Sequence, residues 1–294
     1  MKLRAAFIGA GKLGSAIGGL IRENAASVEF WDKNPALVPD QRPLERVAAE
    51  ADVLFFCVPS WALPEAFASA APHVRRAATV VCVSKGIEKR SGLTVDALFA
   101  RAFPSGPRFV FLGGAMLAAE LAAGTGGAGA AATKSAAAWK TLSALFAGTR
   151  CKLERSADVR GAVMCGILKN VYALGLGMAD GLGWGNNLKG WLAASALREM
   201  AGMLPLLGGR ASTAYSSAGA GDLLATGFSG HSTHRKAGCD LAATGKIDNV
   251  CEGMLAIAPL QKRLGRRAKK FPLFRAIKEI VLLKKPPKSL FDHL

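Results

Sequence analysis

The chain has 294 residues, which is enough for two modest domains or one large one. Hydrophobic residues make up 51% of the sequence and charged residues 20%, a globular composition that excludes an intrinsically disordered chain. The formal net charge of +17 favours anionic partners. The net charge alone does not distinguish phosphorylated metabolites, dinucleotides, nucleic acid and an acidic membrane surface as partners.

The cysteine pattern indicates a reducing compartment. The six cysteines form no CxxC pair and no cluster with histidine, and a chain of this length needs no disulfide staples. We expect reduced core thiols, a cytoplasmic protein and no metal site. The N-terminal stretch is too rich in glycine for a signal peptide and is interrupted by Lys12, while Lys169 and Asp180 interrupt the best membrane-helix candidate. We therefore expect no integral membrane contact.

The first half of the sequence alternates strand-like and helical stretches. Expected strands cover residues 3–9, 27–31, 52–58, 78–84 and 109–113, and expected helices cover residues 12–25, 44–50 and 62–70. Strands that are apolar throughout belong to a parallel sheet covered by helices on both faces. This rhythm predicts the α/β class, with an N-terminal Rossmann-type doubly wound sheet.

The second half is predicted to be helical. The Ala/Gly-rich stretch 122–132, a helix over 135–147 and the segment 150–156 can extend the sheet, and strand signals stop from about Asp158 onward. We expect a first domain over residues 1–155 and an all-α C-terminal domain over 156–294. Residues 161–187 read as one long helix. The tail 261–288, dense in lysine and arginine, is interpreted as a solvated helical face, with a docking or oligomer surface as the alternative.

A glycine-rich loop follows the first expected strand. In "FIGAGKLGSAI", Gly9 makes the tight turn, Gly11 lets the backbone approach a pyrophosphate, and Gly14 lets helix and strand pack closely. Asp32 ends the second strand, 23 residues after Gly9, where an acid accepts hydrogen bonds from an adenosine ribose. This spacing predicts a dinucleotide site with NAD as the cofactor, and Lys33 beside the acid leaves NADP possible.

Polar residues also follow the next two expected strands. Pro59 and Ser60 follow the third strand and Lys85 follows the fourth, at the carboxyl edge where open α/β sheets bind ligands. The alternatives are a strand-ending proline and a solvent-facing loop lysine. Lys169, within the apolar stretch 161–187, needs a partner because a buried ammonium is costly alone. The alternative there is a lysine that reaches solvent.

Six motifs resemble those of the NAD(P)-dependent glycerol-3-phosphate dehydrogenases, over nearly the whole chain. They are "GAGKLGSAI", "CVPSWAL", "VSKGIE", "GILKNVYALGLGMADGLGWGNNLK", "GAGDLLAT" and "CEGMLA", in this order and at these separations. The resemblance implies an N-terminal Rossmann-type domain, an all-helical C-terminal domain and an active site between them. It further implies hydride transfer between a nicotinamide cofactor and C2 of dihydroxyacetone phosphate or sn-glycerol 3-phosphate. We expect a homodimer.

The resemblance assigns roles by position. Lys169 matches the catalytic lysine, which acts as general acid/base, Lys85 matches a second active-site lysine, and Asp222 is the expected counter-charge of Lys169. Reduction of a ketone leaves charge on its oxygen, which suits a positioned cation that can give a proton. The expected cofactor-binding residues are Gly9, Gly11, Lys12, Leu13, Gly14, Asp32, Pro59, Ser60 and Glu252. The expected substrate-binding residues are Lys85, Asn170, Thr226, Ser232, Thr233, His234 and Arg235.

The sequence departs from the family pattern around the substrate phosphate. Thr233 and His234 stand where the family carries an arginine and an asparagine, Asn186 replaces an aspartate, and "GGAMLA" over 113–118 lacks the family's proline and polar residue. Three interpretations stay open. They are the family activity, the same hydride chemistry on another small anionic hydroxy or keto compound, and a non-catalytic dinucleotide-binding or basic nucleic-acid-associated protein. Both lysines and Asp222 speak against the third, and no nucleic-acid partner is expected because no such module is recognisable.

Overall fold

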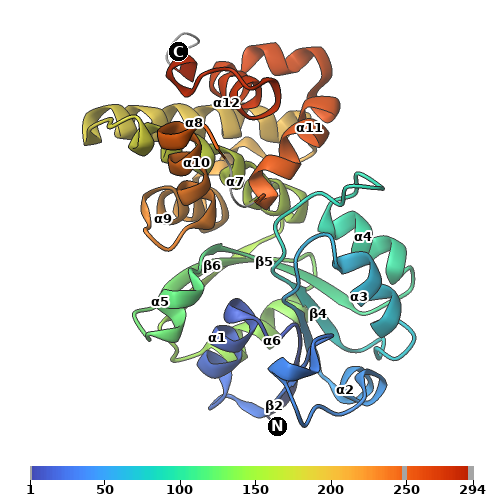
Figure 1. The fold of residues 1–294 in the computed structure, drawn as a ribbon. Helices are drawn as coiled ribbons and strands as arrows, with labels where there is room; N and C mark the ends of the chain where they lie inside the picture. Colours follow the sequence, from blue (N-terminus) through green and yellow to red (C-terminus); the bar gives the residue numbers. More distant parts are fainter. Residues whose placement is uncertain (1, 247–249, 291–294) are drawn as a thin grey trace. The chain divides into compact units, whose positions relative to one another are not determined.

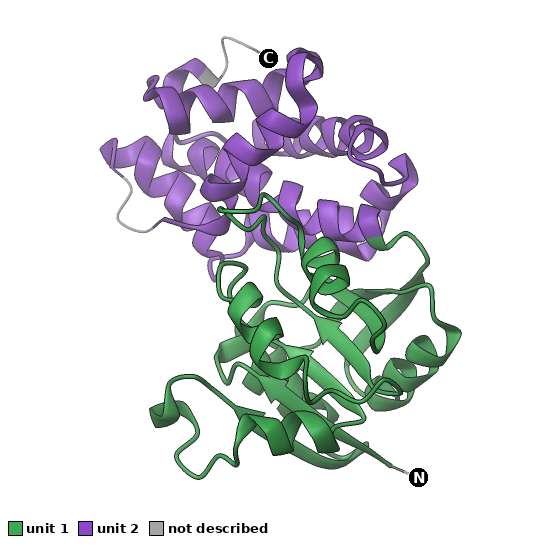
Figure 2. Cartoon of the chain, turned by 90° about the vertical axis from the view of Figure 1, so that its right-hand side faces the viewer, with its two compact units in different colours: residues 1–159 green, residues 160–294 purple. Residues whose placement is uncertain are grey.

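The computed structural model describes residues 2–246 and 250–290 of the chain. The chain forms two compact units, residues 1–159 and residues 160–294 (Figure 2). The division lies four residues beyond the boundary expected from the sequence. The last strand of the first unit, β7 (Cys151–Ser156), ends just before it.

A seven-stranded sheet forms the centre of the first unit, with the strand order β2-β1-β3-β4-β5-β6-β7. The first five strands pair in parallel, β5 and β6 pair antiparallel, and β6 and β7 pair in parallel. The carboxyl ends of β1, β3 and β4 therefore share one edge of the sheet. Besides β7, the strands are β1 (Leu3–Ile8), β2 (Ala25–Trp31), β3 (Val53–Phe56), β4 (Thr79–Cys82), β5 (Arg108–Ala115) and β6 (Gly127–Ala132).

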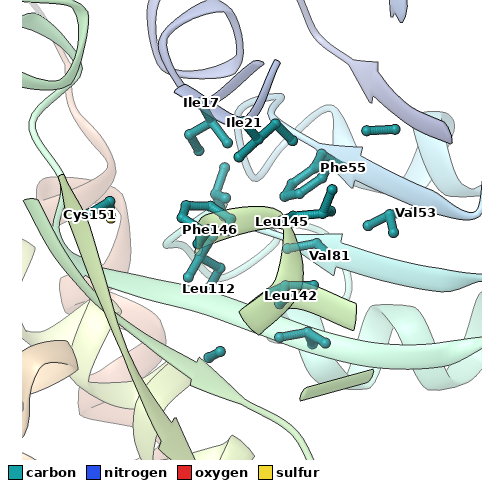
Figure 3. Packing of buried hydrophobic residues seen from close by; sticks show 14 of the residues in the cluster. Ile17, Ile21, Val53, Phe55, Val81, Leu112, Leu142, Leu145, Phe146 and Cys151 are labelled. Atoms are coloured by element: carbon teal, nitrogen blue, oxygen red, sulfur yellow. The ribbon is translucent and has the colours of Figure 1, made fainter. Parts of the chain in front are cut away.

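Helices cover both faces of this sheet (Figure 1), which confirms the Rossmann-type α/β prediction. One face carries α1 (Lys12–Ile21), α5 (Ala118–Ala122) and α6 (Ala136–Phe146). The other carries α2 (Leu44–Glu50), α3 (Leu63–Ala70) and α4 (Val95–Ala102), and the 3₁₀ turn η1 (Pro35–Leu37) precedes α2. Figure 3 shows the core under α1 and α6, in which side chains of both helices pack against strand residues such as Phe55, Val81 and Leu112.

The structure differs from the sequence prediction in several elements of this unit. The first helix ends at Ile21 because β2 already begins at Ala25, and the helices α4 and α5 were not predicted. Strand β6 extends the sheet but runs antiparallel to β5, since the eleven residues between them are fewer than a parallel crossover usually needs. Gly114 and Gly129 face each other in this pair, and a Cβ on Gly114 would lie 2.4 Å from the Ala128 carbonyl oxygen.

The second unit is helical throughout its described residues, as predicted. It begins with α7 (Val159–Gly181) and α8 (Asn186–Leu206), and ends with α12 (Pro272–Leu283) and the 3₁₀ turn η5 (Pro287–Leu290). Between these lie η2 (Ala211–Tyr215), the π-helical turn η3 (Ser217–Gly221), α9 (Asp222–Phe228), α10 (Thr233–Thr244), α11 (Glu252–Leu264) and the 3₁₀ segment η4 (Gly265–Lys270).

Helix α7 forms the core of this unit. Residues 161–179 are all buried. Among the described residues, α7 is the one helix long and apolar enough to cross a membrane, but its apolar window is completely buried, which identifies a core helix. The prediction of one helix over 161–187 is wrong. Helix α7 ends at Gly181, because Gly183 adopts a left-handed conformation with φ of +73° and reverses the chain.

Helix α10 crosses α7 at very short range. A Cβ on Gly177 of α7 would lie 2.0 Å from the Arg235 carbonyl oxygen, and a Cβ on Gly238 of α10 would lie 2.1 Å from the Leu174 carbonyl oxygen. The two backbones therefore touch where both helices carry glycine. This contact fixes the first turn of α10 against α7.

All six cysteines are free thiols, as expected. Cys82, Cys151 and Cys165 are buried, and burial raises the pKa of Cys151 to about 11. The expectation that every cysteine is a core residue is wrong, because the other three are partly exposed.

Candidate active site

The glycine loop after β1 has the shape that a dinucleotide needs. Gly9 has φ of +105°, and a Cβ there would lie 2.8 Å from the Cys57 carbonyl oxygen. A Cβ on Gly14 would lie 2.3 Å from the Gly9 carbonyl oxygen, whereas a Cβ on Gly11 would meet no atom within 4 Å. Gly11 is the N-cap of α1, which begins at Lys12, so the space beside it lies at a helix N-terminus, the kind of place where a pyrophosphate binds backbone amides and the helix dipole.

Asp32 is held beside this loop by backbone amides. Its Oδ2 accepts from the Ala10 amide at 2.8 Å, and its Oδ1 accepts from the Asn34 amide at 2.9 Å. Each carboxylate oxygen keeps a second lone pair for a ribose hydroxyl. The neighbouring Lys33 pairs with Glu65, with 2.6 Å between Nζ and Oε1. A lysine with its own carboxylate partner is less available for a 2′-phosphate.

The remaining expected residues of the first unit follow strand ends. Lys12 is exposed and Leu13 is half-buried in the first turn of α1. After β3, Pro59 is exposed and Ser60 is buried. Lys85 follows β4, is half-buried, and donates to the Gly114 carbonyl oxygen at 3.3 Å. These positions lie at the carboxyl edge of the parallel strands.

In the second unit, Lys169 is buried with two partners on α9. Its Nζ lies 3.0 Å from Asp222 Oδ1 and donates to Thr226 Oγ1 at 2.7 Å. The Thr226 hydroxyl in turn donates to Asp222 Oδ1 at 3.1 Å. The side chains of Lys169 and Asp222 are 7% and 3% exposed. The expected counter-charge is therefore in place, although Asp222 begins a helix rather than lying in a loop.

Two more expected residues lie next to this group along α7 and α11. Asn170 follows Lys169 and is 2% exposed. A Cβ on Gly253 would lie 2.5 Å from the Asn170 carbonyl oxygen and 3.0 Å from His234 Cδ2. The start of α11, with Glu252 as its first residue, thus packs against Asn170 and His234.

The first turn of α10 holds four of the residues expected at the substrate phosphate. Ser232 caps the helix, because its Oγ accepts from the Arg235 amide at 3.1 Å. Thr233 is exposed. The Arg235 guanidinium pairs with Asp180, with 2.5 Å between Nε and Oδ2. Lys189 binds the other oxygen of the same carboxylate at 2.7 Å.

Asp180 is a residue of this region to which the sequence interpretation gave no partner. The sequence interpretation treated it only as an interruption of an apolar stretch. An acid near the end of a buried helix needs a partner of opposite charge, as Lys169 does. The sequence contains two basic residues that could supply it, Lys189 and Arg235. The close crossing of α7 and α10 brings Arg235 to Asp180, and Lys189 reaches the same carboxylate from the first turn of α8.

Comparison with known proteins gives consistent findings for both units. Residues 34–138 match the N-terminus of the NAD-dependent glycerol-3-phosphate dehydrogenase family, and residues 158–292 match its C-terminus. A glycerol-3-phosphate dehydrogenase [NAD(P)+] of Gloeobacter violaceus is 31% identical, with 97% of this chain and 94% of the relative covered. One of Agathobacter rectalis is 30% identical, with 99% and 95% covered.

Solved structures agree on the fold. Glycerol-3-phosphate dehydrogenase from Coxiella burnetii superposes with a TM-score of 0.88 at 23% identity, covering 98% of this chain and 97% of the other. The yeast enzyme GPD1 superposes with a TM-score of 0.82 at 24% identity, covering 100% and 99%. Both likenesses extend over both units.

Proposed function

We propose that this chain, which belongs to the NAD-dependent glycerol-3-phosphate dehydrogenase family, interconverts dihydroxyacetone phosphate and sn-glycerol 3-phosphate. The chain is an NAD(P)-dependent dehydrogenase acting on a CH–OH group. The observation that carries the proposal is the buried group of Lys169, Asp222 and Thr226, which holds one ammonium in a fixed position. A lysine with no functional role usually extends its side chain so that the ammonium reaches water.

Lys169 is the general acid and base of the proposed reaction. Its ammonium binds the substrate carbonyl oxygen and gives it a proton as the ketone becomes an alcohol; in the reverse direction the amine takes the proton back. Asp222 offsets the cost of burying the Lys169 ammonium, and Thr226 fixes the direction of the Nζ hydrogens. Lys85 adds positive charge that stabilises the developing alkoxide.

The nicotinamide cofactor, when bound, supplies or accepts the hydride. Gly9, Gly11 and Gly14 with the N-terminus of α1 would hold its pyrophosphate, and Asp32 would bind its adenosine ribose. We propose that NAD is preferred, since Asp32 repels a 2′-phosphate and Lys33 is paired with Glu65. Lys12, Leu13, Pro59, Ser60 and Glu252 complete the proposed cofactor contacts.

A second candidate function keeps the hydride chemistry but changes the substrate to another small anionic hydroxy or keto compound. Thr233 offers one neutral hydroxyl where the family has an arginine, and Arg235 is engaged by Asp180. An arginine binds phosphate through two charge-assisted hydrogen bonds, so this change weakens phosphate binding unless another base contributes. His234, beside Asn170, is the nearest candidate for that contribution.

The test is reduction of dihydroxyacetone phosphate by the purified chain with NADH or NADPH, compared with unphosphorylated and carboxylated ketones. The proposal is supported if the wild type turns over dihydroxyacetone phosphate and Lys169→Ala lowers that turnover about 10²-fold or more. The matched control is Lys236→Ala, since Lys236 is exposed on α10 and pairs with Asp240. No turnover at millimolar dihydroxyacetone phosphate, with turnover of another ketone, establishes the second function. If Thr233→Arg improves turnover of dihydroxyacetone phosphate, position 233 is the phosphate contact that this chain lacks.

The cellular setting remains part of the proposal. Six free thiols and the family resemblance support a cytoplasmic enzyme, and we propose a homodimer. Light scattering of the purified chain measures the dimer directly.

A further inference from the structure

The positive charge of the second unit is concentrated in one segment. Between Gln261 and Lys288 the chain carries eleven lysines and arginines and a single acidic residue, Glu279. This segment holds ten of the seventeen net positive charges. The rest of residues 160–294 carries eight basic and seven acidic residues, so the basic character is local and not a property of the whole unit.

The outward face of α12 forms the middle of this segment. The buried residues of α12 lie at positions 273, 274, 276, 277, 280 and 281. Arg275, Lys278 and Leu282 follow one another at helical spacing on the opposite stripe. Lys278 Nζ donates to Gln261 Oε1 at 3.3 Å, which joins this stripe to the end of α11. Figure 1 shows α11 and α12 side by side in the second unit.

The charges at both ends of α12 are available to an external partner. Glu279 already interacts with two cations, Arg275 at 4.0 Å and Lys285 at 2.8 Å, and cannot neutralise the others. The segment η4 precedes the helix and adds four exposed cations. Within the described part of the chain these make no ion pair with a carboxylate; they are Arg266, Arg267, Lys269 and Lys270.

Two exposed leucines interrupt the cations at the end of α12. Leu282 is 43% exposed and Leu283 is 63% exposed. Lys284 then adopts a left-handed conformation with φ of +59°, which ends the helix and leaves the leucines at its tip. The apolar face of α12 itself packs inside the unit, so these two leucines are the part of the helix that is free to enter a membrane interface beside the cations. Exposed leucines would add nothing to a surface that binds the phosphates of a nucleic acid.

We propose that the solvent-accessible side chains of residues 262–288, the basic face, dock this protein reversibly on an anionic lipid membrane. The lysines and arginines bind headgroup phosphates, and Leu282 and Leu283 enter the boundary of the acyl chains. Each cation close to such a surface adds attraction that salt screens within a Debye length. The contact is peripheral and leaves the buried helix α7 in the core of its unit.

The experiment is co-sedimentation of the full chain with vesicles of mixed phosphatidylglycerol and phosphatidylcholine, and with phosphatidylcholine alone. We expect salt-sensitive binding to the anionic vesicles only. Lys269→Glu with Lys270→Glu should reduce the partition coefficient at least tenfold, and Leu282→Ser with Leu283→Ser should reduce it several-fold at unchanged net charge. The charge-matched control, Lys134→Glu with Lys140→Glu in the first unit, should bind as the wild type does.

Each outcome decides the proposal. Equal losses in the control and the Lys269/Lys270 variant overturn it in favour of overall charge. Full binding by the leucine variant, with displacement from vesicles by duplex DNA, overturns it in favour of a general polyanion surface. Circular dichroism and the thermal midpoint of each variant, which are independent of enzyme activity, confirm that the variants fold.

Discussion

Helix α7 carries two ion-pair clusters that differ in burial. Lys169 and Asp222 are 7% and 3% exposed, whereas at the far end of the helix Asp180 binds Arg235 and Lys189, which are 26% and 15% exposed. The side chains of the second cluster are therefore more accessible to water than those of the first. The buried pair has a position fixed by the protein, and the half-buried cluster joins α7, α8 and α10.

The largest effect should come from separating the buried pair. Lys169→Met or Asp222→Leu alone leaves a buried charge without its partner and should cost about 3–5 kcal/mol of unfolding free energy. The double variant should recover most of that stability, because a well-packed apolar pair avoids the desolvation cost, while activity stays at least 10²-fold low. Urea unfolding with parallel kinetics measures both. A double variant that regains activity with its stability would contradict a catalytic role for Lys169.

Asp180→Asn should have a smaller effect on stability, about 1–2 kcal/mol, because Arg235 and Lys189 can turn towards water. The catalytic constant should change less than in any Lys169 variant. Thermal midpoints and steady-state kinetics of Asp180→Asn and Asp222→Asn, compared side by side, test the contrast. A larger activity loss at Asp180 would show that this cluster, not the buried pair, contacts the substrate.

Asp32 extends the comparison to a carboxylate held by backbone amides. Asp32→Ser should shift the ratio of kcat/KM for NADPH and NADH about tenfold towards NADPH, equivalent to about 1.4 kcal/mol, by removing repulsion of the 2′-phosphate. Lys33→Ala is the control, since that lysine is paired with Glu65. A wild-type preference of tenfold or more for NADPH would assign the choice to Lys33 or another base.

Glu199 shows what burial does to a carboxylate that has no ion-pair partner in the described residues. Its oxygens accept from the Leu273 and Phe274 amides and from Tyr172. Burial raises its pKa, against the lowering effect of these hydrogen bonds. Burial, and after it the neighbouring Glu199 carboxylate, holds the pKa of Tyr172 well above its usual range.

The smallest predicted effect is the pH dependence that follows from Glu199. Between the ordinary glutamate pKa and the raised value, the folded state holds a proton that the unfolded state has released, so stability falls as pH rises through that window. The same contribution is fully present below the ordinary pKa. Glu199→Gln should flatten the fall, as measured by urea unfolding at a series of pH values. An unchanged slope would show that Glu199 ionises normally.

Local sequence patterns were sufficient for the elements that position the cofactor. The apolar runs of β1, β3 and β4, the glycine spacing from Gly9 to Gly14 and the acid at Asp32 each act over a few residues. The same holds for Lys169, since a charge inside an apolar helix requires a partner. Its identity as Asp222 came from the family resemblance, and the 3.0 Å pair agrees with it.

Other features depended on contacts between distant segments. The antiparallel β6 is built of glycine and alanine, which have weak strand preference, and it forms because Gly114 and Gly129 allow close pairing with β5. The Arg235 side chain could face a ligand or a carboxylate with equal ease, and only the crossing of α10 over α7 placed it on Asp180. The sequence by itself determined the fold class and singled out the candidate site residues, because these depend on residue type and short-range spacing. Tertiary packing decided which cations pair with a carboxylate and which can bind a ligand, because an ion pair depends on distances between side chains that are far apart in the sequence.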